Sequence, residues 1–183
     1  IPFISSGQQT TYEDSLNIFI KKYVEDHEVV KGNSKKKMSF YPVNKSYRIA
    51  CTFQPSNSVN WFLMEASGSI RNEYRVYGTI SFTFQDTLVQ LHLYQSRELM
   101  KTAEYRDHLF IPFADATTSN ETYEGGRYID LNISDIKDGI IIIDFNKAYN
   151  PYCAYDHDYS CPLPPKENHI TIAVRAGEKR FKK

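Results

Sequence analysis

The residues of this chain that could do chemistry are concentrated between positions 108 and 178. Acidic residues, asparagines and tyrosines are interspersed there with glycines, prolines and two cysteines. Such residues either set special backbone angles or need buried hydrogen-bond partners, so we expect a functional site in this stretch. The polar candidates, in chain order, are Glu121, Tyr123, Arg127, Asp144, Asn146, Tyr149, Asn150 and Asn168.

Asp144 follows four consecutive isoleucines, which places it at the end of a predicted buried strand. A carboxylate in such a position must be paired or hydrogen-bonded, or it becomes protonated. It could be a ligand contact or a proton-handling group, or it could anchor the turn into Asn146. Arg127 is the expected ionic partner of Asp144, because a guanidinium matches a carboxylate with two hydrogen bonds. Glu121 and Asp115 are the alternative carboxylates with which Arg127 could pair.

The asparagines and tyrosines of this stretch predict a polar pocket. Arg127, Asp144, Asn146 and Tyr149 are its expected ligand contacts, joined by a second set made up of Tyr123, Asn150 and Asn168. Asparagines next to prolines also form ordinary turns, so a purely structural role stays open for the group.

Cys153 and Cys161 stand eight residues apart and could form a disulfide across a loop, or remain two packed thiols. A disulfide would suit an exported protein, which favours the periplasm or cell surface over the cytoplasm. His157 and His169 are further potential metal ligands, but the spacing matches no standard zinc pattern, and we predict no metal. The sequence identifies no cofactor.

These residues must be positioned by a scaffold that begins with a helix, predicted over residues 10–31. Thr10 stands three residues before Glu13, which is the spacing of a capping box. The apolar residues that follow share one helical face. They are Leu16, Phe19, Ile20, Tyr23 and Val24.

From residue 38 the apolar period changes to two, which is typical of strands. Residues 74–84 and 89–94 predict a hairpin that reverses at Gln85-Asp86, and a short helical connection is expected over 96–107. The isoleucine run at 140–143 predicts a strand buried on both faces.

The last predicted strand covers residues 170–174, after a long loop over 145–169 that contains four prolines. The predicted fold is mainly β. It is an antiparallel meander of about eight or nine strands over residues 38–178, closed into a barrel or folded into a sandwich. We expect one domain over residues 1–183.

Composition excludes some classes of function. The chain has 22 Lys and Arg residues against 22 Asp and Glu residues, which argues against nucleic-acid binding. No apolar run approaches the roughly 18 residues that a membrane-spanning helix needs.

One stretch resembles a known family. Its motifs, all within residues 74–178, are Phe113-x-Asp115, Glu121-Thr-Tyr123-x-Gly-Gly-Arg127-Tyr128, Asp144-Phe-Asn146-x-Ala148-Tyr149-Asn150-Pro151-x-Cys153, Cys161-Pro-Leu-Pro-Pro165-x-Glu167-Asn168 and Ala176-Gly177-Glu178. They resemble the prokaryotic domain of unknown function 1684 (DUF1684). The resemblance implies a bacterial source and a shared site, and it implies no reaction.

Three functional hypotheses follow. The first is a binding protein, in which a β-barrel or sandwich holds a small polar ligand in a pocket covered by the loop over residues 145–169. The second is a hydrolase that uses Asp144 or Glu121 as a general base. The third is a structural or protein-interaction domain in which the polar stretch stabilises the fold.

Overall fold

The computed structural model describes residues 11–182, and its N-terminal element is helix α1 (Tyr12–Asp26). Thr11 caps the helix: its hydroxyl accepts from Asp14 N, and the Asp14 carboxylate accepts from Thr11 N. The predicted capping residue, Thr10, lies outside the described residues. The helix ends five residues earlier than expected, because the backbone turns out of helical geometry at His27 (φ −56°, ψ 123°), where the His27 Nδ1 atom accepts from Val30 N.

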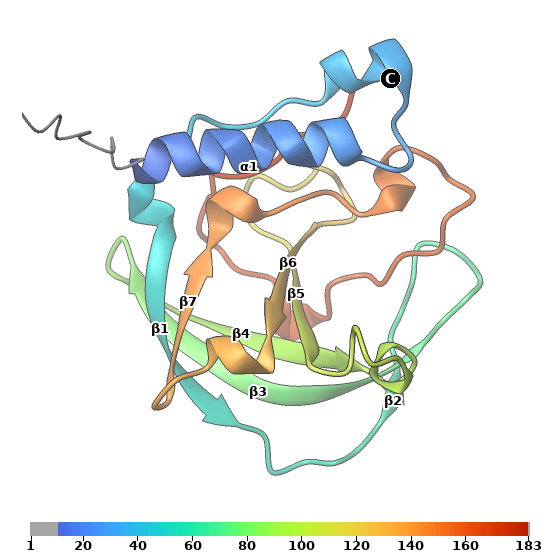
Figure 1. Ribbon diagram of the computed structural model, residues 1–183. Helices are drawn as coiled ribbons and strands as arrows, with labels where there is room; N and C mark the ends of the chain where they lie inside the picture. The colour runs from blue at the N-terminus through green and yellow to red at the C-terminus, as the bar shows by residue number, and fades with distance from the viewer. Residues whose placement is uncertain (1–10, 183) are drawn as a thin grey trace, which may run out of the picture.

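Seven strands form one antiparallel sheet, in the order β6-β5-β4-β3-β1-β7, with β2 paired to β3. The sheet curves into a half-barrel beneath α1 (Figure 1). Its strands are β1 (Arg48–Pro55), β2 (Phe62–Leu63), β3 (Glu73–Phe84), β4 (Thr87–Ser96), β5 (His108–Phe113), β6 (Arg127–Asn132) and β7 (Ile140–Asp144). The predicted hairpin is β3–β4, whose turn residues Gln85 and Asp86 both have positive φ, as the twist of a two-residue hairpin requires.

Short 3-10 helices connect the strands. They are η1 (Gly32–Lys37), η2 (Lys45–Tyr47), η3 (Leu99–Lys101), η4 (Ile133–Asp135), η5 (Phe145–Lys147), η6 (Tyr152–Ala154) and η7 (Lys166–Asn168). The long loop predicted over residues 145–169 therefore contains three of these turns, and the helical connection predicted over 96–107 is reduced to η3.

The sheet does not close, and β6 and β7 are its two edges among the described residues. The strand predicted over residues 170–174 is absent there. That segment makes only scattered backbone bonds, from Ile170 N to Ala114 O and from Ala116 N to Ile172 O. Its apolar side chains still pack in the main core. The alternating pattern therefore reflects burial of every second side chain, although the backbone forms no β-ladder. The count is therefore seven strands, below the predicted eight or nine.

The isoleucine strand β7 is buried on one face only, which corrects the prediction of two buried faces. Ile141 and Ile143 are buried, whereas Ile140 and Ile142 are each 43% exposed. An edge strand of an antiparallel sheet packs one face on the core and presents the other to solvent, so a continuous apolar run did not mean full burial here. Within residues 11–182, no helix combines the length and apolar character that a membrane crossing requires.

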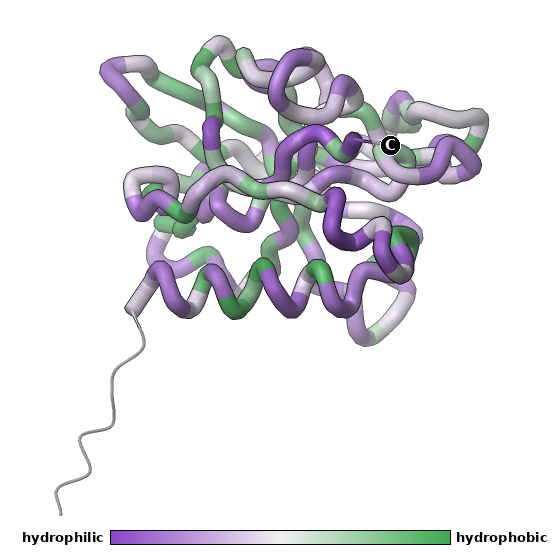
Figure 2. The backbone as a smooth tube through the Cα atoms, turned by 90° about the horizontal axis from the view of Figure 1, so that it is seen from above, coloured by the Kyte–Doolittle hydropathy of each residue, from purple (hydrophilic) through white to green (hydrophobic). Residues whose placement is uncertain are grey.

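Two apolar clusters lie on opposite faces of the sheet. The main core contains Leu109, Ile111 and Ile129 from β5 and β6, and the smaller cluster contains Phe110 and Tyr128. Because side chains alternate along a strand, His108 and Asp130 share the face of Phe110 and Tyr128. This is the face that α1 overhangs. Figure 2, seen from above, shows α1 at one side of the molecule with hydrophilic and hydrophobic residues alternating along it.

Candidate functional site

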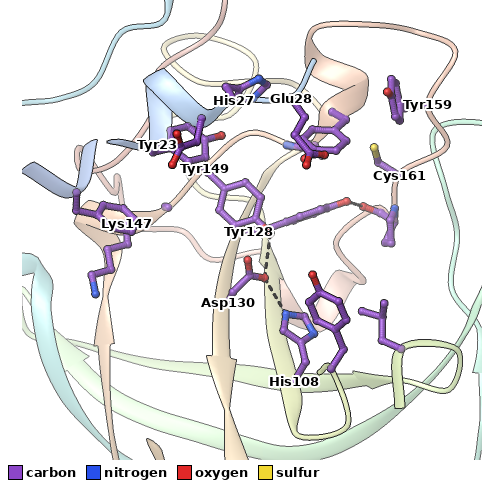
Figure 3. A pocket seen from close by; sticks show the side chains of 18 of the residues that line it. Tyr23, His27, Glu28, His108, Tyr128, Asp130, Lys147, Tyr149, Tyr159 and Cys161 are labelled. Atoms are coloured by element: carbon purple, nitrogen blue, oxygen red, sulfur yellow. Dashed lines mark hydrogen bonds and ion pairs between the residues drawn. The ribbon is translucent and has the colours of Figure 1, made fainter. Parts of the chain in front are cut away.

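A cavity of about 840 Å³ lies between α1, the outer face of β5–β6 and the chain that follows β7 (Figure 3). The apolar stripe of α1 is only partly buried, because Phe19 and Tyr23 line this cavity and do not pack on a sheet. Aromatic side chains are the largest group in the lining. The rings belong to Phe19, Tyr23, Phe40, Tyr105, Tyr128, Tyr149, Tyr152 and Tyr159.

The polar floor of the cavity is built on Asp130. Its Oδ1 atom accepts from Tyr149 Oη at 2.9 Å and lies 3.1 Å from His108 Nε2. Phe110 is the direct cross-strand partner of Asp130, which makes His108 a diagonal neighbour on the same face. The backbone of Tyr149 pairs with Tyr128 in both directions, which brings the Tyr149 ring beside β6.

Asp130 retains an unshared oxygen. Both of the contacts above fall on Oδ1, and the side chain is 51% exposed. Burial, followed by the Asp130 charge, raises the pKa of Tyr149 well above its ordinary value, so Tyr149 stays a proton donor to the carboxylate. Tyr149 therefore orients the Asp130 carboxylate by a hydrogen bond and does not transfer its proton to it.

His27 lies at the opposite side of the cavity, at the end of α1. Its Nδ1 accepts from Val30 N at 2.9 Å, so the ring is neutral and its proton sits on Nε2. Burial, then Lys35 and Lys31, lowers the pKa of His27 and favours the same state. Among the described residues, His27 Nε2 and His108 Nδ1 are buried without a hydrogen-bond partner, and both rings belong to the lining.

Glu178 lies behind the wall formed by Tyr23 and is fully buried. Its carboxylate accepts from Tyr155 Oη at 2.6 Å, Asn150 N at 3.0 Å and Tyr23 Oη at 3.3 Å. Burial raises the pKa of Glu178 to about 7 despite these donors. The preceding Gly177 has φ +76°, and a Cβ there would lie 2.5 Å from Ala148 O, so only glycine permits this approach.

Asp144 and Asn146, predicted to act together, do lie together. Tyr12 Oη donates to Asp144 at 3.0 and 2.9 Å, and Asn146 donates to Asp144 Oδ1 from N and Nδ2. Asn146 also exchanges hydrogen bonds with the Asn44 backbone. The cluster ties the start of α1 to the end of β7, and Asn146 also lines the cavity.

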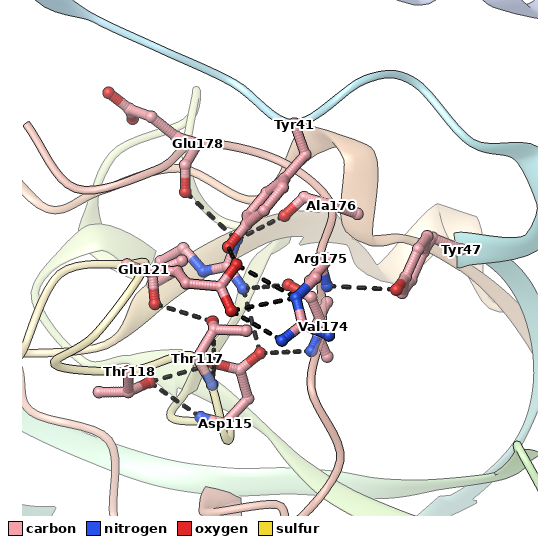
Figure 4. A network of polar contacts seen from close by, with 12 residues as sticks. Tyr41, Tyr47, Asp115, Thr117, Thr118, Glu121, Val174, Arg175, Ala176 and Glu178 are labelled. Carbon is pink, nitrogen blue, oxygen red and sulfur yellow. Dashed lines mark hydrogen bonds and ion pairs between the residues drawn. The ribbon is translucent and has the colours of Figure 1, made fainter.

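Arg127 pairs with Asp115, one of the alternatives, and not with Asp144. Figure 4 shows Asp115 in this network, with its contact to Val174. Both side chains are buried, and Nη2 lies 3.3 Å from Asp115 Oδ2. Arg127 also donates to the carbonyls of Val174, Ala176 and Glu178, while Asp115 Oδ2 accepts from Val174 N at 2.7 Å. This pair therefore satisfies the backbone of the C-terminal segment, in the place where a closing strand was predicted.

Glu121 belongs to the same network but at its surface. It accepts from Arg175 at 2.8 to 3.1 Å and from Tyr41 Oη at 2.9 Å. The Arg175 hydrogen bonds, followed by that of Tyr41, lower the pKa of Glu121. A lowered pKa makes a carboxylate a weaker base.

The remaining asparagine candidates also contact other parts of the fold. Asn168 accepts from His92 N and donates to the carbonyls of His92 and Pro112, so it joins β4 to β5. Asn150 donates from Nδ2 to Lys179 O and from N to Glu178. Neither of them belongs to the lining of the cavity.

Cys153 and Cys161 are adjacent, buried and free. Cys153 N donates to Cys161 Sγ at 3.2 Å, and Tyr123 Oη donates to Cys153 Sγ at 3.6 Å. The Cys161 thiol lowers the pKa of Cys153 to about 6, and the pKa of Cys161 rises correspondingly. The two residues are thus close partners, and their disulfide stays a prediction. Within residues 11–182, no three His, Cys, Asp or Glu side chains gather as metal ligands would.

Comparison with known families gives a match to DUF1684, described as a protein of unknown function, over residues 34–179. This chain belongs to the DUF1684 family. No curated protein matches it. A similar structure was solved by solution NMR for an uncharacterized protein from Haloarcula marismortui. It is 31% identical, with a TM-score of 0.68, and the match covers 90% of this chain and 91% of that one.

The predicted site residues of this DUF1684 member did not include His27, His108, Asp130 or Glu178, although Glu178 closes one of the family motifs. His108 and Asp130 fall at outward positions of alternating strands, so the strand pattern combined with the pairing register would have brought them together. The strand pattern gives no such signal for His27, since its neighbours come from distant segments.

Proposed function

We propose that the protein binds a small molecule in the cavity beneath α1. The observation that carries this proposal is the convergence of aromatic rings with a few oriented polar groups around one hollow of about 840 Å³. Small-molecule sites commonly have volumes of about 300–1,000 Å³ and this type of lining. His27 Nε2 and His108 Nδ1, buried without partners, further support a site that a ligand completes.

The proposed ligand contacts include Tyr149 and Asn146, which line the cavity, together with Asp130. The other sequence candidates would act on the ligand indirectly. We propose that they shape the walls through the hydrogen bonds described above, and they are Tyr123, Arg127, Asp144, Asn150 and Asn168.

A small-molecule fragment screen followed by NMR chemical-shift mapping tests the proposal. We expect bound fragments to shift amides of the lining residues, and Tyr105→Ala and Tyr159→Ala to weaken binding by about fivefold, as loss of an aromatic contact of roughly 1 kcal/mol implies. Phe62→Ala is the matched control, since Phe62 is similarly exposed and lies outside the lining. Fragments that bind only elsewhere would contradict the proposal.

A hydrolase is the second candidate. The observation that favours it is the His108–Asp130 pair on the cavity floor, because a carboxylate that orients an imidazole is a common general-base arrangement. Glu121, with its lowered pKa, is the weaker base. Turnover of ester or glycoside substrates that disappears in His108→Gln would support hydrolysis, and unchanged turnover would exclude this assignment.

A further inference from the structure

We propose that the cavity recognises a ligand with an alkylated ammonium group, in the class of choline-like cations. The inference rests on the proposed function and specifies the ligand of that same cavity. Three observations support it, namely the charge of the lining, the aromatic faces and the unshared oxygen of Asp130.

The charge of the lining favours a cation. Among the described residues that line the cavity, three carry a carboxylate (Asp26, Glu28 and Asp130) and one, Lys147, carries an ammonium. His27 adds no charge, because its Nδ1 accepts a backbone hydrogen bond. An anionic ligand would meet net repulsion here, whereas a cation would be attracted.

The aromatic rings favour a cation that is large and weakly hydrated. The faces of Tyr and Phe rings carry negative potential and attract cations within about 6 Å, and cages of such rings recognise quaternary ammonium groups. One contact of this kind already exists at the edge of the cavity, where Lys147 Nζ lies 5.2 Å from the centre of the Phe19 ring. The ring planes of Tyr128 and Tyr149 are nearly perpendicular, at 85°, so these two lining residues present ring surfaces of different orientation to the cavity.

Asp130 supplies the counter-charge. Tyr149 and His108 hold it through Oδ1, which leaves Oδ2 outside both contacts. An alkylated ammonium ion therefore matches both the carboxylate and the aromatic rings of the site.

The test compares choline with 3,3-dimethyl-1-butanol, which has the same shape and hydroxyl but no charge. NMR titrations at about pH 8, where an unperturbed imidazole is neutral, would give both dissociation constants. We expect choline to bind at least about tenfold more tightly and to shift cavity amides. Asp130→Asn should weaken choline binding about tenfold and leave the neutral isostere unchanged, and Glu28→Gln provides a second test should the first variant fold poorly.

Asp138→Asn is the matched control. It removes the same charge from an exposed turn outside the lining, where φ is +52° and asparagine is well tolerated. Equal binding of choline and its isostere, or equal effects of Asp130→Asn and Asp138→Asn, would overturn the inference. Neutral or anionic fragments that bind the cavity while choline does not would also overturn it and leave the proposed function standing. No binding by any compound would remove both.

Discussion

Replacing Arg127 with methionine removes a buried guanidinium and keeps most of the side-chain length. Arg127 and Asp115 are 1% and 0% exposed, so neither charge can be solvated when its partner is lost. The substitution leaves the Asp115 carboxylate without its counter-ion and removes the donor from the carbonyls of Val174, Ala176 and Glu178. The affected segment contributes Val174 and Ala176 to the main core.

The expected loss is large compared with the stability of the fold. Removing one partner of a buried ion pair costs about 3–5 kcal/mol, because the remaining charge stays buried and unpaired. The total free energy of unfolding of a domain is typically about 5–15 kcal/mol, so the variant should lose about a fifth of its stability or more.

Urea denaturation followed by circular dichroism would measure this loss as a shift of the midpoint. Arg175→Met is the matched control: Arg175 pairs with Glu121 in the same network, but these side chains are 59% and 39% exposed, and such a pair contributes about 1 kcal/mol or less. Adding Asp115→Asn to Arg127→Met should cost little more than Arg127→Met alone, because the two groups act as one pair. If Arg127→Met and Arg175→Met lose similar stability, the assignment of Arg127 as the support of the C-terminal segment is wrong.

Three further predictions concern other clusters. Burial raises the pKa of Glu178 from 4.5 to about 7. The stability that the protonated side chain contributes is therefore complete below the unfolded-state pKa and is lost as the pH rises through about 7. Urea denaturation should show wild type losing about 3 kcal/mol of unfolding free energy relative to Glu178→Gln between these two pKa values, whereas parallel pH profiles would contradict the assignment. Tyr12→Phe removes the hydroxyl that holds Asp144, so amide exchange in α1 should accelerate about tenfold while that of the sheet is unchanged, and unaltered exchange in α1 would show that the contact does not hold the helix. A mild disulfide oxidant should convert the Cys153 and Cys161 thiols to one disulfide, with loss of two hydrogens detected by mass spectrometry and abolished in Cys153→Ser, and full alkylation of both thiols after oxidation would refute the pairing.

The sequence by itself determined the class of fold and most of its elements. The alternation over residues 74–94 predicted the β3–β4 hairpin, and the helical spacing after Glu13 predicted α1, because both signals come from neighbours along the chain. The motif residues identified the DUF1684 family for the same reason, since they are read directly from the chain.

The pairing of distant groups was decided only by the tertiary structure. The sequence allowed Arg127 to pair with Asp144, Asp115 or Glu121, and only the fold showed that its partner is Asp115. The same holds for the closing strand over residues 170–174. Alternation records which side chains are buried and not which backbone partner they have, and here side chains of Arg127 and Asp115 replace the neighbouring strand.

The cavity is also a product of packing. The apolar stripe of α1 indicated burial, but its position over β5–β6 depends on Tyr12, Asp144 and the loop after β7. No pattern of residues along the chain predicts a cavity. It exists because elements that are far apart in the chain are held at a distance by contacts elsewhere in the fold.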